Sequence, residues 1–179
     1  LRVVWDRRCH ASGVTVLPHT AVVEVDRTGG RVAGVMLVSG TELLAVRPAV
    51  AVDASGDGVL AHLAGAASEG FGDIDNPQSL TVTFMLAPVD EATFAAVGRR
   101  GLLERLDEAR ASGRYDLPRK EGSLHATTAP GVVFVHMTRV AGRDPRDPHA
   151  LAAAEREGRA QAMEYARFLI DCVPGFDRA

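Results

Sequence analysis

The segment from residue 49 to residue 66 most constrains the fold of this chain. A fully apolar run at 49–52 leads into Gly56-Asp57-Gly58, and a helical pattern follows over 59–66. Glycine adopts the positive φ angles that a tight turn requires. The segment predicts a strand buried on both faces that turns through two glycines into a short helix, an arrangement typical of α/β proteins.

The residues before this segment predict a β-meander. β-branched residues cluster in short runs separated by turn residues, which is the pattern of strands. Gly29 and Gly30 predict a tight hairpin, since both can take the positive φ of its two central positions. The runs lie at 14–17, 21–25, 32–38 and 43–46.

The second half of the chain alternates strand and helix patterns. Strands are predicted at 79–86 and 131–138, and a helix from Asp90 to about residue 111, with a break at Gly98 or Gly101. Asp147-Pro148 predicts the start of a helix to residue 171, because aspartate caps helices and proline suits their first position. With a boundary near residue 72, we expect two domains, 1–72 and 73–179.

Composition excludes several classes of function. The net charge is -3 with both signs interspersed, so no basic face for nucleic acid is expected. Cys9 and Cys172 lack the spacing of a disulfide framework or a zinc site, which favours a cytoplasmic protein. No apolar run approaches the roughly 20 residues of a membrane span. The first residues lack a signal-peptide pattern and an initiator methionine, and we expect a chain truncated at both ends.

The turn after the apolar run is open to two interpretations from its residues alone. Asp53, Ser55, Asp57 and Gly58 match positions 1, 3, 5 and 6 of a calcium-binding EF-hand loop, but Ala64 stands where that loop needs a glutamate. Residues 56–61 also match the dinucleotide fingerprint G-x-G-x-x-G/A between strand and helix. An acidic residue then sits inside the phosphate loop, and no second strand follows directly.

The motif D-A-S-G-D-G at 53–58 also resembles the later nucleotide-contacting segment of FAD-dependent oxidoreductases of the two-dinucleotide-fold type. The subfamily with the D-A-T-G-D-G-D signature is the most similar. Ser55 replaces its threonine, and Val59 replaces its last acid. The family's N-terminal glycine-rich βαβ unit and its C-terminal flavin-contacting segment are absent. Further segments match in order and approximate spacing, namely 19–25, 31–35, 61–66, V-H-M-T-R-V at 135–140, 147–148, 157–159 and 168–176.

The resemblance implies an α/β fold made of a partial, split Rossmann-like FAD-binding domain with a β-meander, followed by part of a mixed substrate domain. It implies FAD, bound noncovalently, and flavin-mediated oxidation or reduction of a small organic substrate. The implied cofactor contacts are main-chain groups at the adenine, from Ala21, Val22 and Val23, and small residues beside the nucleotide, from Ala54, Ser55 and Gly56.

Two polar residues, and the function as a whole, are each open to two interpretations. Asp57 is either a further cofactor contact or the cap of the following helix. Arg139 either binds a substrate carboxylate or forms a surface ion pair. The alternative to an oxidoreductase is a non-catalytic α/β domain whose loop from Asp53 to Gly58 is structural or binds calcium. No catalytic residue is assigned, because a flavin itself carries the hydride or electrons.

Overall fold

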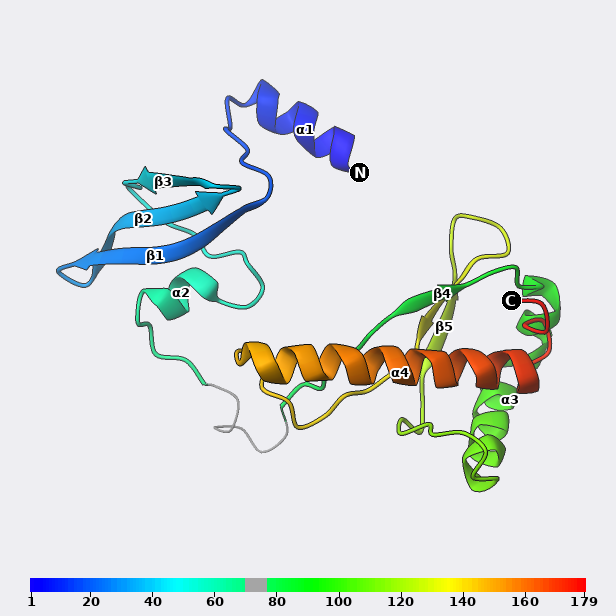
Figure 1. Cartoon of the computed structure of the whole chain (residues 1–179). Coiled ribbons are helices and arrows are strands. Elements are labelled where there is room, and N and C mark those ends of the chain that lie inside the picture. Colours follow the sequence, from blue (N-terminus) through cyan, green and yellow to red (C-terminus); the bar gives the residue numbers. More distant parts are fainter. Residues whose placement is uncertain (70–76) are drawn as a thin grey trace. The chain divides into compact units, whose positions relative to one another are not determined.

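The computed structural model describes residues 1–69 and 77–179, so the predicted boundary near residue 72 lies outside the described residues. The chain divides into two compact units, Leu1–Gly70 and Phe71–Ala179, here called the N-terminal and C-terminal units. Both combine helices with a small antiparallel sheet (Figure 1), which makes the chain a mixed α/β protein as predicted.

The N-terminal unit is built on a three-stranded meander. Strands β1 (Thr20–Thr28), β2 (Arg31–Ser39) and β3 (Glu42–Val46) pair antiparallel in the order β1-β2-β3. Thr28 pairs with Arg31 across Gly29 and Gly30, whose φ angles of 58° and 77° are both positive. This two-residue turn matches the right-handed twist of the strands and confirms the predicted hairpin.

Two helices complete the N-terminal unit. Helix α2 (Val59–Leu63) follows the glycine turn as predicted and packs against β1. Helix α1 (Arg2–Ala11) was not predicted, and it contains no buried residue. Its apolar residues Val3, Val4 and Trp5 are adjacent and are followed by Asp6, Arg7 and Arg8, so the sequence lacks the apolar periodicity that indicates a helix.

The predicted strands at 14–17 and 49–52 are wrong. Neither segment belongs to a strand, and Val50 and Val52 are 79% and 83% exposed. An extended segment becomes a strand only when its N–H and C=O groups pair with a neighbouring chain. No strand in residues 1–69 or 77–179 pairs with either segment.

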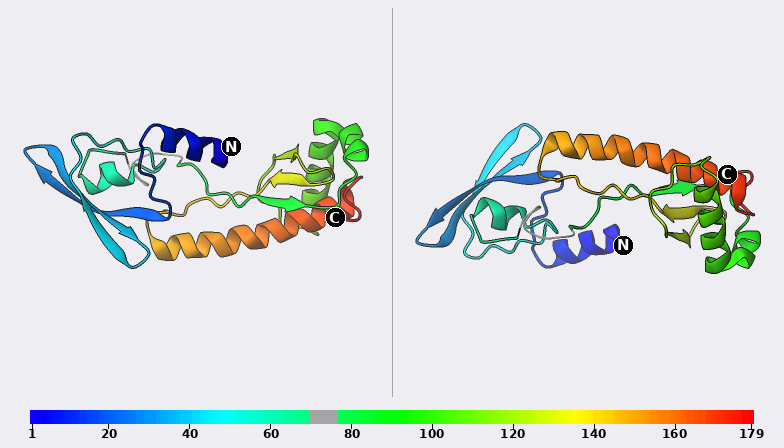
Figure 2. Two further views of the ribbon diagram at one scale, coloured as in Figure 1. Left: turned by 90° about the horizontal axis from the view of Figure 1, so that it is seen from above. Right: turned by 90° about the horizontal axis from the view of Figure 1, so that it is seen from below.

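The C-terminal unit contains a second antiparallel sheet and two long helices. Strands β4 (Phe84–Leu86), β5 (Ser123–Ala126) and β6 (Val133–His136) are ordered β4-β6-β5, with helices α3 (Glu91–Ala111) and α4 (Pro148–Cys172). The C-terminal half of α4 lies along this sheet in both views of Figure 2. The sheet and both helices contribute to one core, which includes Leu102, Leu106, Val133, Val135, Tyr165, Phe168 and Leu169.

The boundaries of these elements agree in part with the sequence predictions. Helix α4 begins as expected, with the Asp147 Oδ1 accepting the His149 N–H at 2.9 Å and Pro148 in the first turn. The break in α3 falls at Gly98, where φ is 64° and ψ is 174°. Strand β5 was not predicted, and the predicted strand 79–86 is regular only in its last three residues.

Side chains replace strand pairing where that predicted strand is incomplete. The buried Thr138 hydroxyl accepts the Val82 N–H at 2.9 Å and donates to the Val82 carbonyl at 2.7 Å. The carboxamide of buried Gln161, on α4, likewise accepts the Arg139 N–H at 2.8 Å and donates to the Arg139 carbonyl at 3.0 Å. These contacts satisfy backbone groups of an irregular segment, as burial demands.

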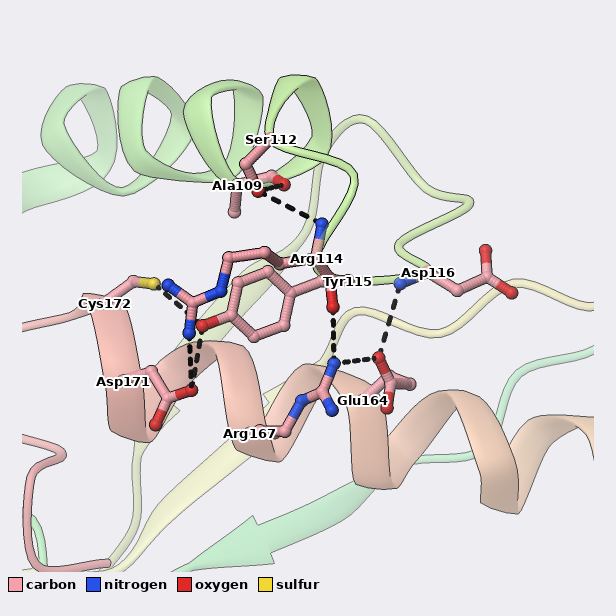
Figure 3. A network of polar contacts seen from close by, with 9 residues as sticks. All are labelled: Ala109, Ser112, Arg114, Tyr115, Asp116, Glu164, Arg167, Asp171 and Cys172. Carbon is pink, nitrogen blue, oxygen red and sulfur yellow. Dashed lines mark hydrogen bonds and ion pairs between the residues drawn. The ribbon is translucent and has the colours of Figure 1, made fainter.

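A polar network joins the loop after α3 to α4 (Figure 3). The buried Tyr115 hydroxyl donates to the Asp171 carboxylate at 2.8 Å and lies 3.4 Å from the Cys172 Sγ. The Arg114 and Arg167 guanidinium carbons lie 5.4 Å and 4.9 Å from the centre of the Tyr115 ring. Burial and both polar neighbours raise the pKa of this hydroxyl, first through Cys172, so it remains protonated.

Replacing Tyr115 with phenylalanine should therefore lower the free energy of unfolding by about 1 kcal/mol, the usual net value of one such hydrogen bond. The ring and its contacts with the two arginines survive, so only the hydroxyl is tested. Urea unfolding followed by amide signals of the C-terminal unit measures the change. Asp171→Asn keeps an oxygen that accepts the hydroxyl and should cost less. Equal stability of Tyr115→Phe and the unchanged chain would contradict this assignment.

Candidate functional site

The glycine turn before α2 is organised by Asp53. Its Oδ1 accepts the Ser55 N–H at 3.0 Å and the Ser55 hydroxyl at 2.7 Å, and its Oδ2 accepts the Ala61 N–H at 2.9 Å. The Ser55 Oγ in turn accepts the Val59 N–H at 3.1 Å. Two side chains thus bind N–H groups of α2 that a helix of this length leaves without internal partners.

Asp57 does not cap α2. The N-cap residue is Gly58, with φ 66° and ψ 34°, and it has no side chain to make a capping bond. Ser55 and Asp53 do this work from further upstream, and the Asp57 side chain is exposed. The capping alternative for Asp57 is therefore wrong, while its role as a cofactor contact stays a prediction.

The carboxylate of Asp53 is engaged within the protein. In the described ranges 1–69 and 77–179, no group of three or more His, Cys, Asp or Glu side chains is placed to hold a metal ion. Both Asp53 oxygens already accept hydrogen bonds from the turn and from α2. These hydrogen bonds give Asp53 a structural role in this loop, and calcium binding stays an untested alternative.

These hydrogen bonds make the turn sensitive to acid. The Ala61 N–H contributes most, followed by the Ser55 hydroxyl and N–H, and together they lower the pKa of Asp53 from 3.8 to about 2. A lowered pKa in the folded state means that ionised Asp53 stabilises the turn above pH 3.8. That contribution is lost as the pH falls from 3.8 towards 2.

We therefore expect the Ser55 and Ala61 amides to lose protection from exchange within this window, with a midpoint below 3.8. A pH titration of amide and carboxyl chemical shifts by NMR measures it. The Asp53→Asn variant has no carboxylate to protonate and should show weak protection that does not change across the window. A carboxyl that titrates at its ordinary value would show that these hydrogen bonds do not form in solution.

The outer side of the turn is open. Ala54, Ser55, Gly56 and Asp57 are exposed, and Gly56 has a φ of 87°. No described heavy atom lies within 4 Å of the position that a Cβ on Gly56 would occupy. Small residues and open space at a glycine let another molecule approach the backbone closely. The open space beside Gly56 is therefore suited to the close approach of one part of a nucleotide.

The other predicted cofactor residues belong to the same unit. Ala21, Val22 and Val23 lie on β1, an edge strand of the meander. The pairing shifts between Val22 and Glu24, so Val23 is the extra residue of a β-bulge. Bulges redirect side chains and interrupt pairing, and an edge strand has main-chain groups without partners in its sheet. The main-chain groups of residues 21–23 can therefore bind a ligand.

Arg139, the predicted substrate contact, lies in the C-terminal unit. Its side chain is exposed, and its Nε donates to the Ser79 hydroxyl at 3.2 Å. Among the described residues no carboxylate lies within ion-pair distance of it. The alternative of a surface ion pair is therefore not supported by the residues that the structure describes. The Gln161 carboxamide binds both the N–H and the carbonyl of Arg139.

Asp53 is the site residue whose role the sequence analysis missed. The sequence placed it at the start of the D-A-S-G-D-G motif and as a possible first calcium ligand, but not as a residue that binds main-chain N–H groups. The signal was present, because aspartate followed two residues later by serine is a spacing at which side chains bind nearby main-chain N–H groups.

Comparison with known proteins gives the family. The family model for FAD dependent oxidoreductases matches residues 1–179. The chain belongs to this family. Its cofactor is FAD, as the resemblance implied. No curated protein and no solved structure matches the chain. As to membranes, none of the described helices has the length and apolar character of a bilayer span.

Proposed function

We propose that this chain supplies part of the FAD site of a longer oxidoreductase that acts on a small organic molecule. The observation that carries the proposal is the open, internally braced turn at Gly56. Its inner side is held by Asp53, and its outer side presents a left-handed glycine to empty space. The family match adds independent support for flavin chemistry.

In this proposal the N-terminal unit is part of a split Rossmann-like FAD-binding domain. Ala54, Ser55 and Gly56 let the backbone meet the nucleotide, and Asp57 contacts the cofactor. Main-chain groups of Ala21, Val22 and Val23 lie at the adenine. The bulge at Val23 and the edge position of β1 support such contacts. FAD supplies hydride or electron transfer when bound, and these residues hold and orient it.

The C-terminal unit is proposed as part of the substrate domain, with Arg139 binding a carboxylate of the substrate. The clamp by Gln161 holds the Arg139 backbone while its guanidinium stays exposed. We also propose the D-A-T-G-D-G-D subtype, with Ser55 and Val59 as departures, and a cytoplasmic location. The two free cysteines, Cys9 and Cys172, agree with a reducing compartment.

Three variants test the cofactor turn in the full-length protein. Gly56→Val should weaken FAD binding about tenfold, since its side chain occupies the space through which the nucleotide approaches the backbone. Asp57→Asn should change affinity much less. Gly40→Val is the matched control for backbone strain, because Gly40 also has a positive φ, 60°, and open space at its Cβ. FAD affinity is measured by quenching of flavin fluorescence.

The outcomes separate the proposal from its rival. Equal effects of Gly56→Val and Gly40→Val would show that strain alone acts and that the turn faces away from the nucleotide. The rival is a non-catalytic domain with a structural or calcium-binding loop. A full-length protein that stays colourless after reconstitution with FAD favours it, and calorimetry with calcium tests the ion.

A further inference from the structure

The C-terminal unit contains a cavity between the first half of α3 and strand β5. Its volume is about 330 Å³, within the range of about 300–1,000 Å³ that small-molecule sites occupy. Phe94 and Leu102 from α3 and Leu124 from β5 form apolar parts of its wall. Three polar side chains, Arg99, Ser123 and His125, also line it. An apolar wall with a few polar groups is typical of ligand sites.

Arg99 is held at this cavity by a single weak contact. Its Nη1 lies 3.5 Å from the Gly122 carbonyl oxygen, and no other hydrogen bond or ion pair of Arg99 is found in the described part of the chain. The neighbouring Arg100 differs, because its Nε binds the Glu104 carboxylate at 2.8 Å. A guanidinium carries five N–H donors, so that of Arg99 keeps several for another group.

The backbone of the cavity wall is constrained at two glycines. A Cβ on Gly122 would lie 2.6 Å from the Met137 Cγ, so this part of the wall packs directly against the residue after β6. Gly98 leaves helical geometry at φ 64°, a conformation that side chains rarely adopt. The Gly122 carbonyl that receives Arg99 is thus part of the closely packed wall.

The charge and polarity of the cavity wall define which class of ligand fits the cavity. None of the described residues that line the cavity carries a carboxylate, so Arg99 gives the wall a net positive charge. An arginine guanidinium binds a carboxylate through two parallel hydrogen bonds. A small inorganic anion would leave the apolar wall in contact with water. A molecule with an apolar body and one carboxylate satisfies both parts.

We propose that this cavity binds a small organic carboxylate. Its carboxylate pairs with the Arg99 guanidinium, the His125 imidazole offers a further polar contact, and its apolar body packs on Phe94, Leu102 and Leu124. Arg139, assigned above to the substrate, does not line this cavity. The inference rests on the C-terminal unit alone and does not depend on flavin binding.

The test uses 3-phenylpropanoate as a probe, added to the 179-residue chain and followed by ¹H–¹⁵N NMR. We expect saturable shifts of the amides around Gly98 and over 122–125. The neutral amide of the same acid should bind at least tenfold more weakly, since it lacks the charge, and acetate likewise, since it lacks the apolar body. Arg99→Gln should weaken 3-phenylpropanoate at least tenfold. Arg100→Gln, on the same helix but with its charge bound to Glu104, should leave it unchanged.

A second variant tests whether the probe occupies the cavity, independently of the Arg99 charge. Ala95 lines the cavity and is exposed on α3, so Ala95→Trp fills the site without disturbing the core. This substitution should abolish the shifts that 3-phenylpropanoate causes in the amides of residues 122–125. The proposal is overturned if the probe produces no saturable shifts, if the amide binds as well as the acid, or if Arg99→Gln and Arg100→Gln behave alike. It is equally overturned if Ala95→Trp binds the probe unchanged.

Discussion

Replacing Gly175 with alanine is expected to lower the free energy of unfolding of the C-terminal unit by about 3–4 kcal/mol. Gly175 has a φ of 95°, and a Cβ there would lie 2.6 Å from the Asp90 carbonyl oxygen and 3.0 Å from the Phe94 nitrogen. These are backbone atoms of the first turn of α3 and its cap, so no side chain can rotate away. The helix start would have to move.

The expected loss of stability follows from the contacts around Gly175. The Asp90 N–H donates to the Gly175 carbonyl at 2.8 Å, and the Phe94 and Phe176 rings pack edge to face with centroids 5.2 Å apart. Moving the helix start disturbs this hydrogen bond and the packing of the fully buried Phe176 together. Overpacking and left-handed strain then add, which makes this one of the largest effects of a single methyl group.

Gly113 provides the matched control. Its φ is also positive, at 69°, but no described atom lies within 4 Å of its Cβ position. Gly113→Ala should therefore cost only about 1 kcal/mol, from the backbone strain. Urea unfolding of both variants, followed by amide signals of the C-terminal unit, measures the difference. If the two substitutions cost the same, the close approach of residue 175 to α3 is not present in solution.

Local chemistry made part of the fold predictable. The β1–β2 hairpin follows from two adjacent glycines between strand patterns, and α4 from Asp147 and Pro148 ahead of a periodic apolar face. In each case the residues that decide the structure are neighbours in sequence. The same holds for Gly98, where α3 is interrupted.

Pairing between distant segments was not predictable. The apolar composition of 49–52 indicates a buried strand, yet Val50 and Val52 are exposed and no described strand pairs with them. Thr138 shows the converse, because its hydroxyl supplies to Val82 the hydrogen bonds that a neighbouring strand would make. A side chain acting as a strand partner 56 residues away leaves no local pattern.

The candidate site was likewise predictable where its residues are neighbours in sequence and not where they are distant. The exposed turn at residues 54–57 was located from D-A-S-G-D-G, but the bond from the Ala61 N–H to Asp53 spans eight residues and was not anticipated. The cavity at Arg99 joins a helix to a strand that the sequence did not reveal. Such juxtapositions depend on the packed C-terminal unit, so only a structure shows them.

The 179-residue chain by itself is expected not to hold FAD firmly. In the described part of the N-terminal unit Val35 is the one buried residue, while Val23, Leu43, Val50 and Val52 are exposed. So much uncovered apolar surface indicates a unit that needs further cover to be stable, and it favours self-association. A turn on such a unit is not held rigidly enough to bind a nucleotide tightly.

The contacts available to the cofactor are also incomplete. Besides residues 56–61, no segment of the sequence matches G-x-G-x-x-G/A, so no other glycine loop is present to place the pyrophosphate on a helix N-terminus. Titration of the purified chain with FAD, followed by flavin fluorescence, should show no saturable quenching in the submicromolar range. Size-exclusion chromatography, run in parallel, should show association beyond a monomer. Saturable submicromolar binding by a monomeric chain would contradict both expectations, and loss of that binding in Gly56→Val but not in Gly40→Val would then locate a complete FAD site at this turn.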